Sequence, residues 1–149
     1  MYKKTKVKIQ WIIITFLDIK EQLAFFNGKT FENIDLEDNV VIENIKEIYI
    51  ELCRFVKHVG ATKVMYLLKP EVFIMWDTKI INHYRTNKTV GKIDKSPEGY
   101  VNFMKLMQKL YKNGELPQPD KDNESITRAI DRYNWEKYTV SSNKKIKKD

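Results

Sequence analysis

The fold is indicated most clearly by residues 59–77, which read VGATKVMYLLKPEVFIMWD. Gly60 precedes a run that contains good helix formers, and Pro70 cannot continue that helix because proline lacks a backbone N–H. A short apolar connector follows and ends at Asp77, a residue type that is preferred at helix N-caps. This order predicts a helix over 61–69, a connector, and a next helix that begins at Asp77.

Helical patterns with clear ends extend over most of the chain. Apolar residues recur at 3- and 4-residue steps, and capping residues, prolines and glycines stand where helices should begin or end. The predicted helices cover residues 9–26, 41–59 (capped by Asp38 or Asn39), 61–69, 78–85, 97–113 (after Ser96) and 124–138. The first of these is apolar over most of its circumference, which predicts a buried helix, although its β-branched start also fits a strand.

Length and composition predict one all-α domain, a compact bundle of five to six helices. The chain has 149 residues, of which 42% are apolar, and this is enough for one core. We expect the helical domain to span residues 9–140. Residues 1–8 form a basic arm in this prediction, and the basic tail over 141–149 is predicted to be disordered.

Several classes of protein are disfavoured by the composition. No apolar run reaches the 18–20 or so residues that a membrane span requires. The lysine-rich start imitates a signal peptide, but Asp18 soon follows without a cleavage site, which favours a first core helix. The single cysteine, Cys53, predicts a packing residue in a cytoplasmic protein without a disulfide or an iron–sulfur cluster. The two histidines lack ligand-like spacing, so no metal or other cofactor is expected.

The net charge of +7 arises entirely from the two ends of the chain. Residues 1–8 and 144–149 hold eight basic residues and one acid, whereas the rest of the chain is balanced. Within that balanced part, residues 18–51 are acidic and residues 54–95 are basic. The basic half fits contact with nucleic-acid phosphates, or an ordinary basic helix packed beside an acidic one.

Residues 56–60, Val-Lys-His-Val-Gly, occupy the place of a Leu-Pro-Gly-apolar-Gly hairpin, and Asp77 follows at the start of a later helix. This order resembles the helix-hairpin-helix DNA glycosylase superfamily, although Lys57 and His58 replace the proline and the first glycine. The resemblance implies a glycosylase-like fold whose hairpin N–H groups bind a DNA phosphate. The alternative is a simple helix–helix joint with Gly60 as the residue that ends the first helix.

Two residues are implied as catalytic by the same resemblance. In that family the aspartate at the position of Asp77 stabilises the cationic sugar or activates water, and some members use a lysine as nucleophile. Lys63 lies one position after the family's lysine, and Thr62 occupies the matching position. The alternatives are that Asp77 only caps its helix and that Lys63 is an ordinary surface lysine.

The residues expected to contact nucleic acid are Lys57, His58, Gly60, Thr62, Trp76 and Arg85. Trp76 could stack on an extruded base or pack into the core. Residues 60–77 and 130–138 also resemble blocks of small uncharacterised prokaryotic proteins. This resemblance carries no known function, but it suggests that the final helix belongs to the domain and lies near the same cleft. We therefore expect a DNA-binding protein, a reduced member of the glycosylase-like class. The competing hypothesis is a non-enzymatic module that binds a protein partner.

Overall fold

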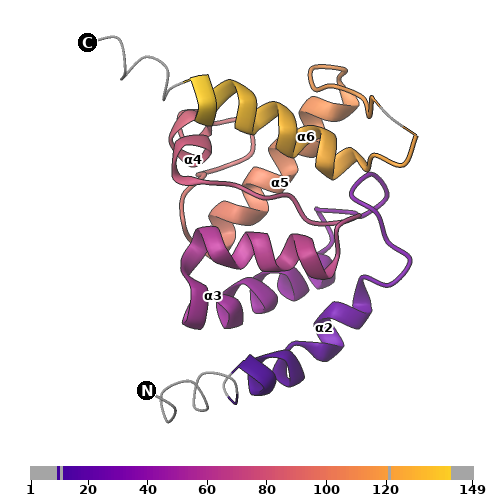
Figure 1. The fold of residues 1–149 in the computed structure, drawn as a ribbon, viewed down its shortest axis with the longest axis vertical. Helices are drawn as coiled ribbons and strands as arrows, with labels where there is room; N and C mark the ends of the chain where they lie inside the picture. The colour runs from indigo at the N-terminus through magenta and orange to yellow at the C-terminus, as the bar shows by residue number, and fades with distance from the viewer. Residues whose placement is uncertain (1–9, 11, 121, 142–149) are drawn as a thin grey trace.

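The computed structural model describes residues 10, 12–120 and 122–141, and within them it contains helices and loops but no strand. Residues 12–18 are helical. The further helices are α2 (Lys20–Phe25), α3 (Asn39–Leu68), α4 (Thr78–Tyr84), α5 (Pro97–Lys112), α6 (Ile126–Asn134) and the π-helix η1 (Trp135–Val140). α3 packs against both α2 and α5, and η1 packs against α4 (Figure 1). The prediction of an all-α domain is confirmed. The basic arm over 1–8 and most of the predicted tail lie outside the described residues.

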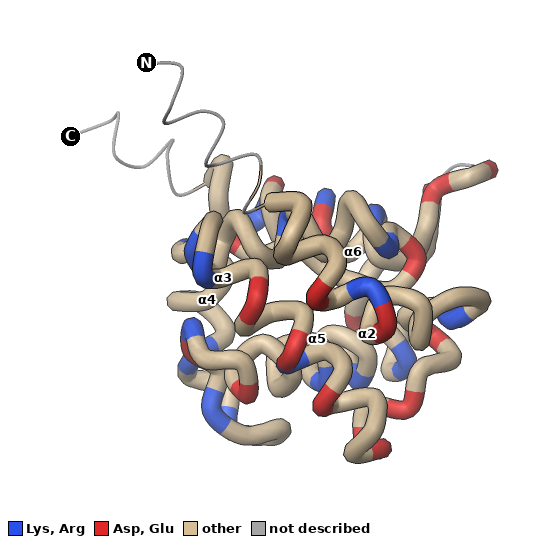
Figure 2. Tube along the Cα trace, turned by 90° about the horizontal axis from the view of Figure 1, so that it is seen from below, with Lys and Arg blue, Asp and Glu red and all other residues tan. Residues whose placement is uncertain are grey.

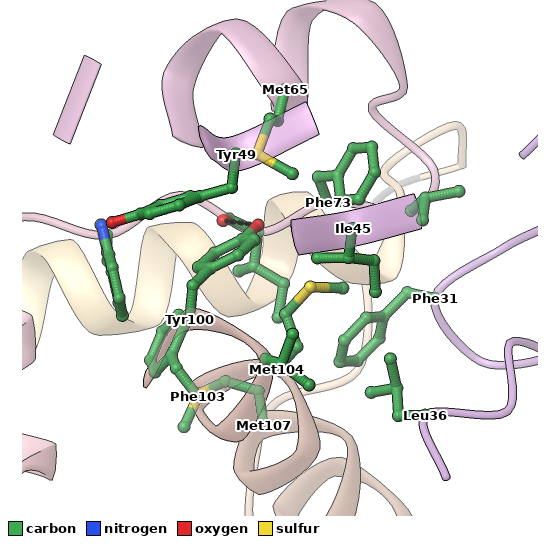
Figure 3. Packing of buried hydrophobic residues seen from close by; sticks show 14 of the residues in the cluster. Phe31, Leu36, Ile45, Tyr49, Met65, Phe73, Tyr100, Phe103, Met104 and Met107 are labelled. Carbon is green, nitrogen blue, oxygen red and sulfur yellow. Dashed lines mark hydrogen bonds between the residues drawn. The ribbon is translucent and has the colours of Figure 1, made fainter. Parts of the chain in front are cut away.

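The core is built around α5. Its side chains Tyr100, Phe103, Met104 and Met107 are fully buried, as the apolar stripe predicts. Figure 3 shows these residues meeting side chains from α3, from the loop before α3 and from the connector after it: Ile45, Tyr49, Met65, Phe31, Leu36 and Phe73. The connector therefore passes through the core rather than over it. This burial fixes the position of Asp77 at the end of the connector.

Four helices begin at a side chain that accepts a hydrogen bond from a free backbone N–H group. Asp38 accepts from Val40 (2.8 Å), Asp77 from Ile80 (2.8 Å), Ser96 from Gly99 (3.0 Å) and Ser125 from Arg128 (3.2 Å). Each such cap stabilises a helix by about 1 kcal/mol. The predicted starts of α3, α4 and α5 are confirmed, and Asp38 rather than Asn39 is the cap of α3.

The break between the two hairpin helices lies at Lys57, three residues before the predicted joint at Gly60. α3 continues to Leu68 in its helical geometry except at Lys57, whose φ is 56° and ψ is 176°. Gly60 lies inside the second helix, so the alternative interpretation, in which it ends the first helix, is wrong. A Cβ on Gly60 would lie 2.8 Å from the Cβ of Val56. Glycine is therefore required by close approach of the two helices rather than by its own backbone angles.

The prediction of a buried first helix is also wrong. A turn at Ile19 separates residues 12–18 from α2, and Ile13 and Leu17 are 54% and 64% exposed. Among the described residues of the predicted span, only Thr15, Ile19 and Phe26 are buried. The physical reason is that the core is already filled by α3, α5 and the connector. The early helix can therefore bury one narrow stripe only, and its remaining apolar side chains face outward.

Candidate functional site

One cleft brings the two sequence blocks together. It has a volume of about 560 Å³ and lies where the second half of α3, the connector, α4 and the final helices meet. Its lining residues are Lys63, Met75, Trp76, Asp77, Ile80, Arg128, Asp131, Arg132, Trp135 and Glu136. Lys63 and Asp77 therefore share a cleft, and the final helices border it as expected. Gly60 is not one of the lining residues.

Asp77 is held by hydrogen bonds to both oxygens of its carboxylate. Oδ1 accepts from the backbone N–H of Ile80 at 2.8 Å, which caps α4, and Oδ2 accepts from the hydroxyl of Thr139 at 2.5 Å. The second bond ties η1 to the start of α4. The carboxylate is thus a cap, as its alternative interpretation states, and at the same time a fixed group on the cleft wall.

Lys63 and Thr62 point in different directions. Lys63 is exposed and lines the cleft. Thr62, which occupies the family's lysine position, is fully buried. Its hydroxyl donates to the carbonyl of Val59 at 3.1 Å and accepts from the N–H of Trp76 at 3.4 Å. Thr62 therefore links the hairpin to the connector, and its side chain is committed to this structural role.

The hairpin residues Lys57 and His58 lie outside the cleft lining. Lys57 is exposed at the break in α3. Burial lowers the pKa of the His58 imidazole, and the charges of Lys95 and Lys57 lower it further. His58 is therefore neutral at pH 7 and adds no charge for a phosphate contact. Its carbonyl accepts from the indole N–H of Trp76 at 3.3 Å, which closes the hairpin over the core.

The two tryptophans at the cleft have different environments. Trp76 is 1% exposed and packs against Tyr100 and Phe103, with ring centroids 5.1 and 5.3 Å apart. This is the core position that its alternative interpretation describes. Trp135 is 55% exposed and also lines the cleft. Its indole is the aromatic surface at this site that a ligand can reach.

Arg85 lies away from the cleft. It ends α4 and lines a separate hollow that also contains Ile93 and Ser96. Elsewhere in the basic half, Arg54 pairs with Glu51 at 2.9 Å and Lys92 pairs with Asp94 at 2.9 Å. Figure 2 shows Lys and Arg interspersed with Asp and Glu over the side that it views. Part of the basic charge of residues 54–95 is therefore paired with acidic neighbours.

Two arginines of α6 border the cleft beside Lys63. Arg132 pairs with Glu124 at 3.2 Å and with Asp120 at 2.8 Å, which orients its guanidinium toward the acidic residues before α6. Arg128 is exposed. The cleft thus combines three cations, of which Arg132 is already paired, with the acidic side chains Asp77, Asp131 and Glu136 and an exposed indole at its edge. Cations beside an aromatic side chain can contact a phosphate and a flat ring.

Asp131 is one of several residues of this site that the sequence interpretation did not single out. It lies on α6, is 5% exposed and lines the cleft. Oδ1 accepts from the backbone N–H of Met75 at 2.9 Å, whereas Oδ2 has no hydrogen-bond partner among the described residues. Burial raises the pKa of this carboxyl well above its usual range, against the opposing effects of the Met75 N–H and of Arg128.

A sequence signal for Asp131 does exist. Thr127, Asp131 and Asn134 are all buried and follow one another at 4- and 3-residue steps, so they share one face of α6. A carboxyl group on the buried face of an amphipathic helix is uncommon unless it has a partner or a function. For Trp135 and the two arginines the sequence carries no equivalent signal, because exposed residues of these types are common at any surface.

The comparisons with known proteins add no assignment: no protein-family model, curated protein or solved structure matches this chain. Among the described residues, no cluster of three or more His, Cys, Asp or Glu side chains could hold a metal ion. No described helix is both long enough and apolar enough to cross a membrane.

Proposed function

We propose that this protein binds DNA and that its cleft receives a nucleobase turned out of the helix, in the manner of a reduced base-excision glycosylase. The observation that carries the proposal is the meeting of Lys63 and Asp77 in one cleft, beside Arg128 and Arg132. Lys63 and Asp77 were predicted from a sequence resemblance. The two arginines and Trp135 are known from the structure. They add positive charge for a phosphate and an aromatic surface for a base.

The size and lining of the cleft support this ligand class. Small-molecule sites commonly have volumes of about 300–1,000 Å³, and the cleft, at about 560 Å³, lies within that range. Met75 and Ile80 provide apolar walls, and the exposed indole of Trp135 provides a surface for stacking. Stacking on an aromatic side chain stabilises a bound base by about 1–3 kcal/mol.

The reaction that fits this arrangement is cleavage of an N-glycosidic bond. Asp77 would stabilise the positive charge that develops on the sugar as the base leaves, since its carboxylate is fixed by Ile80 and Thr139. Lys63 would contact a phosphate. It lies one position from the family's lysine and is exposed rather than desolvated, so borohydride trapping on abasic DNA should give no specific cross-link.

Fluorescence anisotropy with a labelled DNA duplex tests the proposal. Binding should weaken steeply as salt rises, because each neutralised phosphate releases counterions. Lys63→Ala should weaken binding and reduce the slope of the salt dependence by about one. Lys112→Ala is the matched control, because this exposed lysine lines a different hollow of the molecule. Equal effects of the two substitutions, or no binding at low salt, would contradict the proposal.

A second candidate function is a module that binds a protein partner. The observation in its favour is the exposed apolar surface of Ile12, Ile13, Phe16 and Leu17. A contiguous apolar surface of this kind commonly marks an interaction site. Leu17→Lys separates the two functions: it should abolish an apolar protein contact, whereas it should leave the salt-dependent binding of DNA at the cleft intact.

A further inference from the structure

The cleft contains a buried carboxyl group with one uncommitted oxygen. The Asp131 side chain is tied to the connector through Oδ1, which accepts from the N–H of Met75 at 2.9 Å. Oδ2 has no hydrogen-bond partner among the described residues and is shielded from solvent. A buried polar atom without a partner costs about 1–3 kcal/mol. A group that is kept at such a cost, on the wall of a cleft, is a candidate for contact with a ligand.

The groups that face Asp131 leave it unpaired. Arg128 lies on the same helix, Tyr66 approaches from α3, and Tyr100 approaches from α5. The hydroxyl of Tyr100 is already committed, since it donates to the carbonyl of Ile74 at 2.9 Å. Lys63 and Asp77 line the same cleft. None of these groups donates a hydrogen bond to Oδ2.

An unpaired and buried carboxylate is far less stable than a buried carboxylic acid. In the acid form one oxygen accepts hydrogen bonds and the other carries an O–H that donates one. Oδ1 already accepts from Met75, so the proton belongs on Oδ2. The cleft therefore presents a neutral O–H donor among charged side chains such as Lys63, Asp77 and Arg128.

From this geometry we infer that Asp131 is the base-reading residue of the cleft: its protonated Oδ2 donates a hydrogen bond to a ring nitrogen or carbonyl oxygen of the bound nucleobase. The inference rests on the proposed function and specifies its ligand, a base with an acceptor atom on the edge that enters the cleft. The base would stack on Trp135 while its acceptor reaches Asp131. Asp131 lines the cleft and its Oδ2 is shielded from solvent, so a side chain at the cleft changes rotamer before a ligand reaches that atom.

Titration of the protein with free adenine, followed by NMR, tests this role. Adenine has ring-nitrogen acceptors, and indole serves as the control probe because it stacks but has no such acceptor. Asp131→Asn keeps an acceptor for Met75 and places an N–H donor where the O–H was. It should bind adenine within about twofold of the wild type. Asp131→Leu removes the donor and should bind adenine at least about fivefold more weakly, with indole unaffected.

Each outcome decides the inference. Asp131→Asn that folds yet loses adenine would show that a carboxylate accepts from the ligand, which overturns the inference. If Asp131→Leu binds adenine as tightly as the wild type, Asp131 serves only to hold the connector through its hydrogen bond with Met75, and this result also overturns the inference.

Should Asp131→Leu fail to fold, pH decides the matter. As pH rises, the affinity of the wild type for adenine should fall, and its midpoint should match the pH at which the carboxyl ¹³C shift of Asp131 titrates. The affinity of Asp131→Asn should not change over the same pH range. Equal pH dependence in both proteins would overturn the inference. Duplex binding is measured separately and distinguishes the two proposals. If the wild type does not bind a duplex, the proposed function is contradicted. The role of Asp131 is tested only by the adenine titrations.

Discussion

The carboxylate of Asp77 has two neighbours, the N–H of Ile80 and the hydroxyl of Thr139, and substitution can separate its two roles. Asp77→Ala should destabilise the protein by about 0.5–2 kcal/mol, because the cap of α4 is lost. Asp77→Asn should unfold close to the wild-type temperature, since asparagine caps helices about as well as aspartate.

Duplex binding should respond differently to the same substitutions. Asp77→Asn removes a negative charge beside Lys63 and should bind DNA more tightly, by about twofold or more. Asp38→Ala is the control: it removes the cap of α3, away from the cleft lining, and should lower stability without changing DNA affinity. Equal melting temperatures of Asp77→Ala and the wild type would contradict the capping role.

Asp131 should make the stability of the protein depend on pH. Its folded-state pKa is raised by burial, whereas in the unfolded chain it titrates near about pH 4. Between these two values the unfolded state loses the proton and the folded state keeps it, so the stabilisation present below about pH 4 is lost as pH rises. Asparagine does not ionise, so Asp131→Asn should not lose stability as pH rises. At pH 7 its free energy of unfolding should exceed that of the wild type by roughly 1–3 kcal/mol.

Chemical denaturation at a series of pH values measures this effect. The advantage of Asp131→Asn should shrink as pH falls toward about 4, where both states of the wild type are protonated. Asp94→Asn provides a contrast, because hydrogen bonds from Ser96 and Lys92 lower the pKa of Asp94 to about 2. That substitution should destabilise the protein at neutral pH. An Asp131→Asn protein less stable than the wild type at pH 7 would contradict the prediction.

At the scale of the helices, the sequence predicts ends better than it predicts breaks. Asp38, Asp77 and Ser96 act through N–H groups two or three residues away, so their caps can be recognised locally. The break at Lys57 has no such signal, because lysine rarely adopts a positive φ. Gly60 suggests the wrong position for the break because its absent side chain serves contact with Val56 instead.

Lys57→Gly should therefore stabilise the protein. A non-glycine residue at φ 56° and ψ 176° is strained by about 1–3 kcal/mol, and glycine relieves that strain at some cost in unfolded-state entropy. We expect a net gain of about 1 kcal/mol. Lys63→Gly is the matched control, since the same change inside a regular helix should destabilise by about 0.5–1 kcal/mol. Thermal unfolding of both variants compares the signs, and a loss of stability in Lys57→Gly would show that Lys57 is unstrained.

At the scale of the whole molecule, the net charge and the cleft belong to different parts of the chain. The whole excess of +7 comes from residues 1–8 and 144–149. Removing both segments should leave a folded protein that binds duplex DNA more weakly and with a shallower salt dependence. Circular dichroism and anisotropy measure the two properties. Unchanged affinity would confine any DNA contact to the cleft and its surroundings.

The candidate site could be predicted only in part, because it is assembled from segments far apart in the chain. Asp77 and Lys63 follow from a local motif, and the resemblance of residues 130–138 to small prokaryotic proteins predicts that the final helix lies near them. Asp131 and Trp135 enter the site through the packing of α6 and η1 against the connector and α4. That packing depends on the whole core, which no short stretch of sequence specifies.

The bond between Thr139 and Asp77 places part of the cleft under the control of the last helical turn that the structure describes. Helix ends open more often than helix centres, and amide hydrogen exchange measures how often. Exchange at Thr139 should be faster than at Ile130, which is fully buried in α6. Each opening of that turn releases Oδ2 of Asp77 while Ile80 still holds Oδ1. The carboxylate would then alternate between a closed form and one with a free oxygen facing the cleft, at a rate that the end of η1 sets.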